Sequence, residues 1–176
     1  MMTAAELLAF EEDIAQEFSA GKIHAPVHLS GGNEAQLIDY FYKNVQPHDY
    51  CFCSWRSHYH CLLKGVPPDV VKTAIMQGHS ISLNFPQYRI FSSAIVGGIA
   101  PIALGVAQSF QWFENVASDH QSTVHVFLGD MSARSGIVHE CMEYAAGHSL
   151  PVRWIVEDNG MSICTPTRET WETYST

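Results

Sequence analysis

The segment TVHVFLGD, residues 123–130, predicts a buried β-strand that ends in a tight Gly-Asp turn. Residues 136–148 then show helical spacing of apolar side chains, and residues 152–156 predict a second buried strand before the turn EDNG, residues 157–160. A strand, a helix and a strand in this order form a parallel unit, and its right-handed crossover places both strand ends at one edge of a sheet. In such sheets, ligands bind beyond the carboxyl ends of the strands.

Further elements are predicted on the amino-terminal side of this unit. Apolar spacing and turn residues predict four more helices, in residues 1–20, 33–46, 67–78 and 99–113. Residues 51–55 predict a short buried strand, whereas residues 78–93 show no apolar period and predict a long loop. The pattern as a whole predicts an α/β fold.

Bulk composition limits the class of protein. The chain has 176 residues, the length of one ordinary domain, and 47% of them are hydrophobic, which is enough to supply a core. Nine basic and 18 acidic residues give a formal charge of -9, which repels nucleic-acid phosphates and anionic membranes. No stretch approaches the roughly 20 consecutive apolar residues of a membrane helix. We therefore expect a cytoplasmic protein with no nucleic-acid partner and no membrane association.

Asp130 and Asn159 stand just past the two predicted strand ends, 29 positions apart (159 − 130). The crossover brings them together, and a carboxylate with an amide carbonyl oxygen is a ligand set that Mg²⁺ prefers when phosphate oxygens complete it. Turn chemistry alone would explain either dipeptide taken singly. Their pairing across one complete helix and one complete strand favours a metal site.

With this pairing the sequence resembles thiamine-diphosphate enzymes, whose motif begins Gly-Asp-Gly and ends in Asn. Gly129-Asp130-Met131 matches that beginning except that Met131 replaces the third glycine. More specifically, three segments resemble alpha subunits of the first component of 2-oxo acid and acetoin dehydrogenases. They are HLSGGNEA (28–35), WRSHYHCLLKG (55–65) and AIVGG (94–98).

The resemblance implies thiamine diphosphate and Mg²⁺ as cofactors. It assigns the metal to Asp130, Asn159 and the backbone carbonyl of Met161. It assigns the cofactor to Trp55, Arg56, Ala94, Val96, Gly129, Asp130, Met131, Ser132, Asn159 and Met161. The guanidinium of Arg56 would hold the diphosphate. Val96 would support the bent cofactor, and the Ala94 carbonyl would accept from its aminopyrimidine.

His58 and His60 are the catalytic residues that the resemblance implies, as proton-handling groups near the cofactor or substrate. For either residue taken singly, a hydrogen-bonded core histidine is an equally good interpretation.

The resemblance also implies a beta-type partner subunit that supplies the activating glutamate, in an α2β2 heterotetramer. The chain alone should then be inactive. Together the two chains would cleave a small-molecule ketone, a 2-oxo acid or a ketose, and transfer the two-carbon unit. The family's KGxGGSMH stretch is absent and the chain ends 17 residues after Asn159 (176 − 159). Three alternatives stay open: a transketolase-like carboligase subunit, a non-catalytic module that binds Mg²⁺ or nucleotide phosphate, and a scaffold subunit.

The expected architecture is a single thiamine-diphosphate-binding domain over residues 1–176. It comprises an N-terminal helix in residues 1–20 and a cofactor-binding core in residues 21–176. The expected fold class is α/β, three-layered, with a parallel sheet flanked by helices and truncated at the C-terminus.

Overall fold

The computed structural model describes residues 2–113 and 122–171, so residues 1, 114–121 and 172–176 of the predicted domain lie outside the description. The helices are α1 (Ala4–Ser19), α2 (Glu34–Asn44), α3 (His58–Leu63), α4 (Pro68–Ala74), the π-helical turn η1 (Ile75–His79), the 3-10 turn η2 (Pro86–Tyr88), α5 (Ile99–Phe113), α6 (Asp130–Ala133), α7 (Gly136–Gly147) and α8 (Thr167–Trp171). The strands are β1 (Tyr50–Cys53), β2 (Asn84–Phe85), β3 (Ile90–Ser92), β4 (Val124–Gly129), β5 (Val152–Glu157), β6 (Met161–Ser162) and β7 (Thr165–Pro166).

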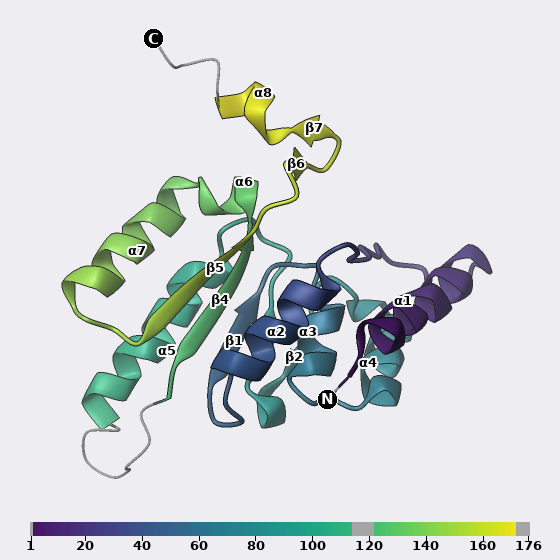
Figure 1. The fold of residues 1–176 in the computed structure, drawn as a ribbon, viewed down its shortest axis with the longest axis horizontal. Coiled ribbons are helices and arrows are strands. Elements are labelled where there is room, and N and C mark those ends of the chain that lie inside the picture. Colours follow the sequence, from purple (N-terminus) through teal and green to yellow (C-terminus); the bar gives the residue numbers. More distant parts are fainter. Residues whose placement is uncertain (1, 114–121, 172–176) are drawn as a thin grey trace.

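A five-stranded sheet in the order β2-β3-β1-β4-β5 forms the centre of the molecule (Figure 1). Strands β3, β1, β4 and β5 are parallel, and only the two-residue strand β2 runs antiparallel to its neighbour. Strands β4 and β5 pair over their full length, from Val124 opposite Val152 to Gly129 opposite Glu157. The predicted parallel strand–helix–strand unit is therefore confirmed. The prediction that its second strand is buried is wrong, because β5 is an edge strand of this sheet and none of its residues is buried.

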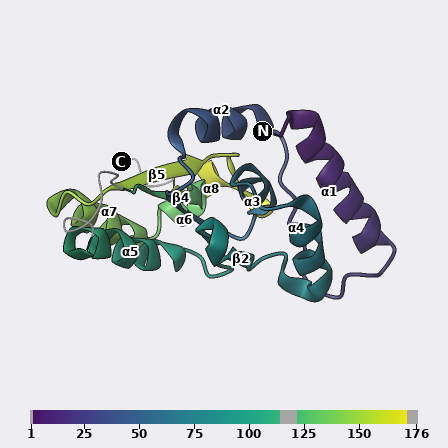
Figure 2. The same cartoon turned by 90° about the horizontal axis from the view of Figure 1, so that it is seen from below.

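Each face of the sheet carries its own hydrophobic core, because successive side chains of a strand point to opposite faces. Cys51 and Cys53 of β1 pack with helices α1 to α4, whereas Phe52 between them packs with α5 and α7. Figure 2 shows α2 on one side of β4 and β5, with α5 and α7 on the other. The α/β prediction and its three layers are confirmed.

Helix α1 begins where the sequence provides an N-terminal cap. The Thr3 hydroxyl accepts from the Glu6 N–H at 3.3 Å, and the Glu6 carboxylate accepts from the Thr3 N–H at 2.7 Å, which forms a capping box. Leu7 and Ile14 lie two turns apart on the helix face that is completely buried. This confirms the predicted amphipathic N-terminal helix.

One prediction of local structure fails between residues 54 and 93, and one helix in this range was not predicted. The predicted long loop in residues 78–93 is wrong, because it contains β2, η2 and β3 and thus supplies two strands of the sheet. Strand β3 is only three residues long, too short to show a period, and Ile90 is fully buried by its packing rather than by any local pattern. The short helix α3, which the sequence analysis does not predict, follows β1 directly and is buried at five of its six positions.

The described residues contain no helix that combines the length and apolar character needed to cross a membrane.

Candidate cofactor and metal site

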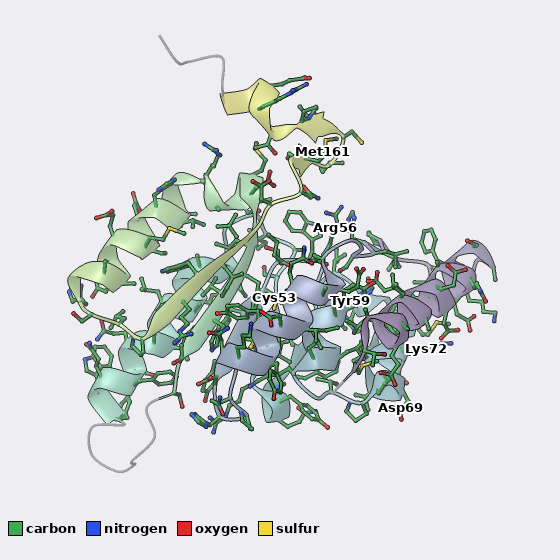
Figure 3. All side chains as sticks on the ribbon, in the orientation of Figure 1. Cys53, Arg56, Tyr59, Asp69, Lys72 and Met161 are labelled. Carbon is green, nitrogen blue, oxygen red and sulfur yellow. The ribbon has the colours of Figure 1, made fainter. Side chains whose placement is uncertain are left out.

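Four parallel strands lead into the residues that the sequence singles out. Arg56 follows β1, Ala94 and Val96 follow β3, Asp130 immediately follows β4, and Asn159 follows β5. Because these strands are parallel, their carboxyl ends lie at one edge of the sheet, which is called the carboxyl edge below. Figure 3 shows Arg56 and Met161 at this end of the molecule, with Cys53 further down β1.

Asp130 is the first residue of α6 and is buried, with 7% of its surface exposed. Gly129 before it has extended backbone and turns the chain from strand to helix. The Asp130 carboxylate accepts a hydrogen bond from the Thr167 hydroxyl, and α6 contacts both β5 and β6. The structure therefore brings Asp130 to the segment that carries Asn159 and Met161.

Asn159 lies in an exposed turn after β5. Its side-chain oxygen accepts from the Met161 N–H at 3.0 Å, and Asp158 accepts from the Gly160 N–H at 2.8 Å. An amide oxygen has two lone pairs, so the Asn159 oxygen keeps one for a cation while it holds this turn. Gly160 has a φ of 67°, which a residue with a side chain rarely adopts.

Arg56 and Asn33 carry buried polar atoms that lack partners. Among the described residues, neither Arg56 Nε nor Asn33 Oδ1 has a hydrogen bond, although Asn33 Nδ2 donates to Glu157 Oε1 at 2.9 Å. A buried N–H without an acceptor is costly, and an anionic ligand would satisfy it. The position of Arg56 therefore fits the diphosphate role that the sequence predicts.

His28 lies near Trp55 and Arg56, and it was not among the predicted site residues. Its ring centroid is 6.4 Å from that of Trp55. Burial lowers the pKa of His28, and the positive charge of Arg56 lowers it further. A neutral imidazole can donate and accept one hydrogen bond each. The segment HLSGGNEA, which begins with His28, was the available signal for this residue.

The two predicted catalytic histidines occupy different environments. His58 is fully buried, with Nδ1 3.1 Å from Glu11 Oε1 and Nε2 2.9 Å from Ser80 Oγ. This arrangement matches the alternative interpretation, a hydrogen-bonded core histidine. The catalytic role of His58 stays a prediction.

His60 is also buried, yet its ring nitrogens form no hydrogen bond within the described part of the chain. Its Nε2 lies 3.3 Å from Glu157 Oε2, close enough for an ion pair but without hydrogen-bond geometry. The rings of Phe41 and Phe127 pack against it, with centroids 6.1 and 4.6 Å away. Of the two histidines, His60 keeps more capacity for a ligand.

The segment after β3 packs against the start of α7. Gly97 has a φ of 70°, and a Cβ at this position would lie 2.8 Å from Ser135 Oγ. The Ser135 hydroxyl in turn donates to the carbonyl of Ser132, the buried third residue of α6. Ala94 and Val96 precede this contact and are exposed, Val96 by 57%. An exposed apolar residue here is available to a ligand.

The donor chemistry of the carboxyl edge fits Mg²⁺ bound together with a phosphorylated ligand. No group of three His, Cys, Asp or Glu side chains that could hold a metal occurs in residues 2–113 and 122–171. A closed metal cage is therefore not formed by those side chains. Asp130, Asn159 and a backbone carbonyl would instead hold an ion that phosphate oxygens complete, the mode that Mg²⁺ commonly uses.

Comparisons with known proteins show which family the chain resembles. The family model described as dehydrogenase E1 component matches residues 2–176. The chain is 32% identical over 169 residues to the pyruvate dehydrogenase E1 component subunit alpha of Rickettsia conorii, which covers 90% of this chain and 50% of the relative. It is 30% identical over 166 residues to the chloroplastic subunit alpha-3 of Arabidopsis thaliana, covering 88% and 39%.

A third relative, the E1 alpha subunit of Zymomonas mobilis, is 28% identical over 167 residues, covering 89% of this chain and 46% of the relative. The chain thus spans half or less of the length of these relatives. Because the family match extends over nearly all of its residues, the chain belongs to the dehydrogenase E1 component family.

Proposed function

We propose that this chain is the alpha-type subunit of a two-chain enzyme that uses thiamine diphosphate and Mg²⁺. The observation that carries the proposal is the convergence of Arg56, Asp130 and Asn159 beyond the ends of three parallel strands of one sheet. The similarity to alpha subunits of pyruvate dehydrogenase supports a 2-oxo acid as the substrate class. When bound, the cofactor supplies the electron sink for cleavage of the bond beside a ketone carbonyl.

In this proposal the residues of the chain mainly bind and orient. Asp130, Asn159 and the Met161 carbonyl hold Mg²⁺, and the Arg56 guanidinium binds the diphosphate. Backbone groups of Gly129, Met131 and Ser132 line the diphosphate side. Met131 occupies the position of a motif glycine, as the second residue of α6, and is partly exposed. At the other end, the Ala94 carbonyl accepts from the aminopyrimidine, while Val96 and Trp55 supply apolar contact.

His60 is the better-placed of the two histidines for moving a proton. Its Nε2 lies 3.3 Å from the Glu157 carboxylate, and its ring nitrogens form no hydrogen bond in the described part of the chain, so they can contact a ligand. His58, held between Glu11 and Ser80, would instead keep the wall behind the site in place. His60→Gln and His58→Gln form a matched pair. His60→Gln should lower turnover more, and the free energy of unfolding less, than His58→Gln.

The proposal includes a beta-type partner that supplies the activating glutamate, in an α2β2 heterotetramer that transfers a two-carbon unit from a small ketone. Glu157, the glutamate at the end of β5, is occupied by Asn33 and adjoins His60. The Glu157 carboxylate therefore already has partners within this chain. A separate chain remains the source of the activating carboxylate.

Calorimetry of the chain with its partner subunit, Mg²⁺ and thiamine diphosphate tests the proposal. Asp130→Ala should weaken cofactor binding by about 100-fold, because it removes a charged ligand from the metal. Asp69→Ala, on α4 and away from the carboxyl edge, is the matched control and should bind like the wild type (Figure 3).

Equal cofactor affinity in Asp130→Ala and wild type would contradict the metal site. The same titration with ATP separates the alternative of a non-catalytic phosphate-binding module. Tighter binding of ATP than of thiamine diphosphate would favour that alternative.

A further inference from the structure

Thr167 contacts both segments that carry the candidate metal ligands, the start of α6 and the turn after β5. It is the first residue of α8 and is buried, with 8% of its surface exposed. Its hydroxyl donates to Asp130 Oδ2, and its N–H donates to the Gly160 carbonyl at 2.9 Å. Gly160 lies between Asn159 and Met161. One residue therefore contacts the carboxylate after β4 and the turn after β5.

A short hairpin brings Thr167 to this position. Strands β6 and β7 pair antiparallel, with Met161 opposite Pro166 and Ser162 opposite Thr165. This pairing reverses the chain directly after the Asn159 turn. As a result Thr167 returns to Asp130, from which it is 37 positions distant in the sequence.

We propose that Thr167 is a positioning residue that fixes the Asp130 carboxylate and the Asn159 turn in the arrangement that binds the metal. The proposal rests on the proposed function. A carboxylate has two oxygens, and a hydrogen bond to Oδ2 sets its plane and leaves Oδ1 for a cation. Groups behind a metal ligand that hold its orientation commonly affect affinity tenfold or more.

The hydrogen bond from the Thr167 N–H acts on the turn after β5. The Gly160 carbonyl is held by Thr167, while the Asn159 side chain and the Asp158 side chain each accept from N–H groups of the same turn. The turn is thus fixed from both sides. The Met161 carbonyl and the Asn159 oxygen then need little rearrangement when a cation binds, which reduces the entropic cost of binding.

Manganese titration tests the role of the hydroxyl. Mn²⁺ binding to the chain with its partner subunit and thiamine diphosphate is followed by electron paramagnetic resonance. Thr167→Val keeps the shape and removes the hydroxyl, so Mn²⁺ affinity should fall by about tenfold. Thr167→Ser restores the hydroxyl and should restore the affinity. Thr165→Val, the same substitution at an exposed position of the same hairpin, should leave it unchanged.

The melting temperature without metal separates positioning from stability. Wild-type Mn²⁺ affinity in Thr167→Val, even with a lowered melting temperature, would overturn the inference. Tighter binding would overturn it as well, because the hydroxyl would then compete with the cation. Thr167→Ala repeats the test if the valine variant does not fold.

The outcome for wild-type protein distinguishes the two proposals. If the wild type binds Mn²⁺ and Asp130→Ala does not, while Thr167→Val equals the wild type, only the role of Thr167 fails. If the wild type shows no Mn²⁺-dependent cofactor binding, the proposed function fails and the inference with it.

Discussion

A buried polar network at the amino ends of the parallel strands is hydrogen-bonded among its own members, whereas several buried polar atoms at the carboxyl edge have no hydrogen bond from the described residues. At the amino end, Tyr40, His125 and Asp49 form a closed chain, with Tyr40 Oη 2.8 Å from His125 Nδ1 and His125 Nε2 3.2 Å from Asp49 Oδ2. The Asp49 carboxylate also accepts from the N–H groups of Thr123 and Gln46, at 2.8 and 2.7 Å. At the carboxyl edge, Arg56 Nε, Asn33 Oδ1 and the His60 ring have no hydrogen bond from the described residues.

The comparison shows how a binding site differs from a structural network made of similar residues. A network that only stabilises the fold satisfies its own members, since an unpaired buried polar group costs free energy. A site keeps groups unpaired in the absence of ligand because the ligand completes them. Substitutions at the amino end should therefore cost stability, and substitutions at the carboxyl edge should cost binding.

Asp49→Ala should give the largest effect on folding. It leaves His125 buried without its carboxylate and two backbone N–H groups without an acceptor, so the free energy of unfolding should fall by about 3–5 kcal/mol. Urea denaturation measures this change. Asp39→Ala is the matched control, because the exposed Asp39–Lys43 pair should contribute less than about 1 kcal/mol. Similar losses in both variants would contradict the distinction between the two ends.

The pH dependence of stability should sharpen the same point. Burial raises the pKa of Asp49, but hydrogen bonds from His125 and the backbone outweigh it and leave the pKa at about 2, below its ordinary 3.8. A lowered pKa stabilises the fold above the ordinary value, and this contribution is lost as the pH falls from about 4 to about 2.

Over that pH range the wild type should lose on the order of 2 kcal/mol more than Asp49→Asn. Denaturation of both proteins at pH 5 and pH 2 measures the difference. Parallel losses would show that the Asp49 network does not depend on its charge.

Arg56→Ala, at the carboxyl edge, should weaken cofactor binding rather than lower the free energy of unfolding, the opposite of Asp49→Ala. Loss of charge-assisted hydrogen bonds to the diphosphate should weaken cofactor binding by about tenfold or more. The free energy of unfolding should change little, because Arg56 Nε has no described partner to lose. Calorimetry and urea denaturation give the two values, with the exposed Arg153→Ala as control. A large loss of stability with unchanged binding would place Arg56 among the structural residues.

The sequence predicted the elements whose side chains carry a local pattern. Strands β4 and β5 are six residues long and each ends in turn residues that are visible in the sequence, but only β4 is buried as its apolar residues predicted. Helix α3 was missed because it is buried on nearly all sides and so has no amphipathic period. Strand β3 was missed because its partners, β1 and β2, determine its conformation more than its own three residues do.

The site was predictable only in part, for a related reason. Asp130 and Asn159 could be paired because a crossover connection places consecutive parallel strand ends together. The contact of Thr167 with Asp130 depends on a two-residue hairpin strand and on tertiary packing, for which the sequence has no period. The hydrogen bonds of the His58 ring depend on Glu11 and Ser80, which are 47 and 22 positions away in the sequence.

Helix α1 lies at the periphery in Figure 1, yet it is not a detachable module. Its Glu11 carboxylate accepts from the Ser30 N–H at 2.9 Å and adjoins the fully buried His58. Lys72 of α4 also donates to Asp13 of α1. A chain that started after this helix would expose the imidazole of His58 and free the loop before α2. The division at residue 20 therefore marks a change in the sequence pattern, and the unit that evolution or protein engineering could transplant would have to include α1.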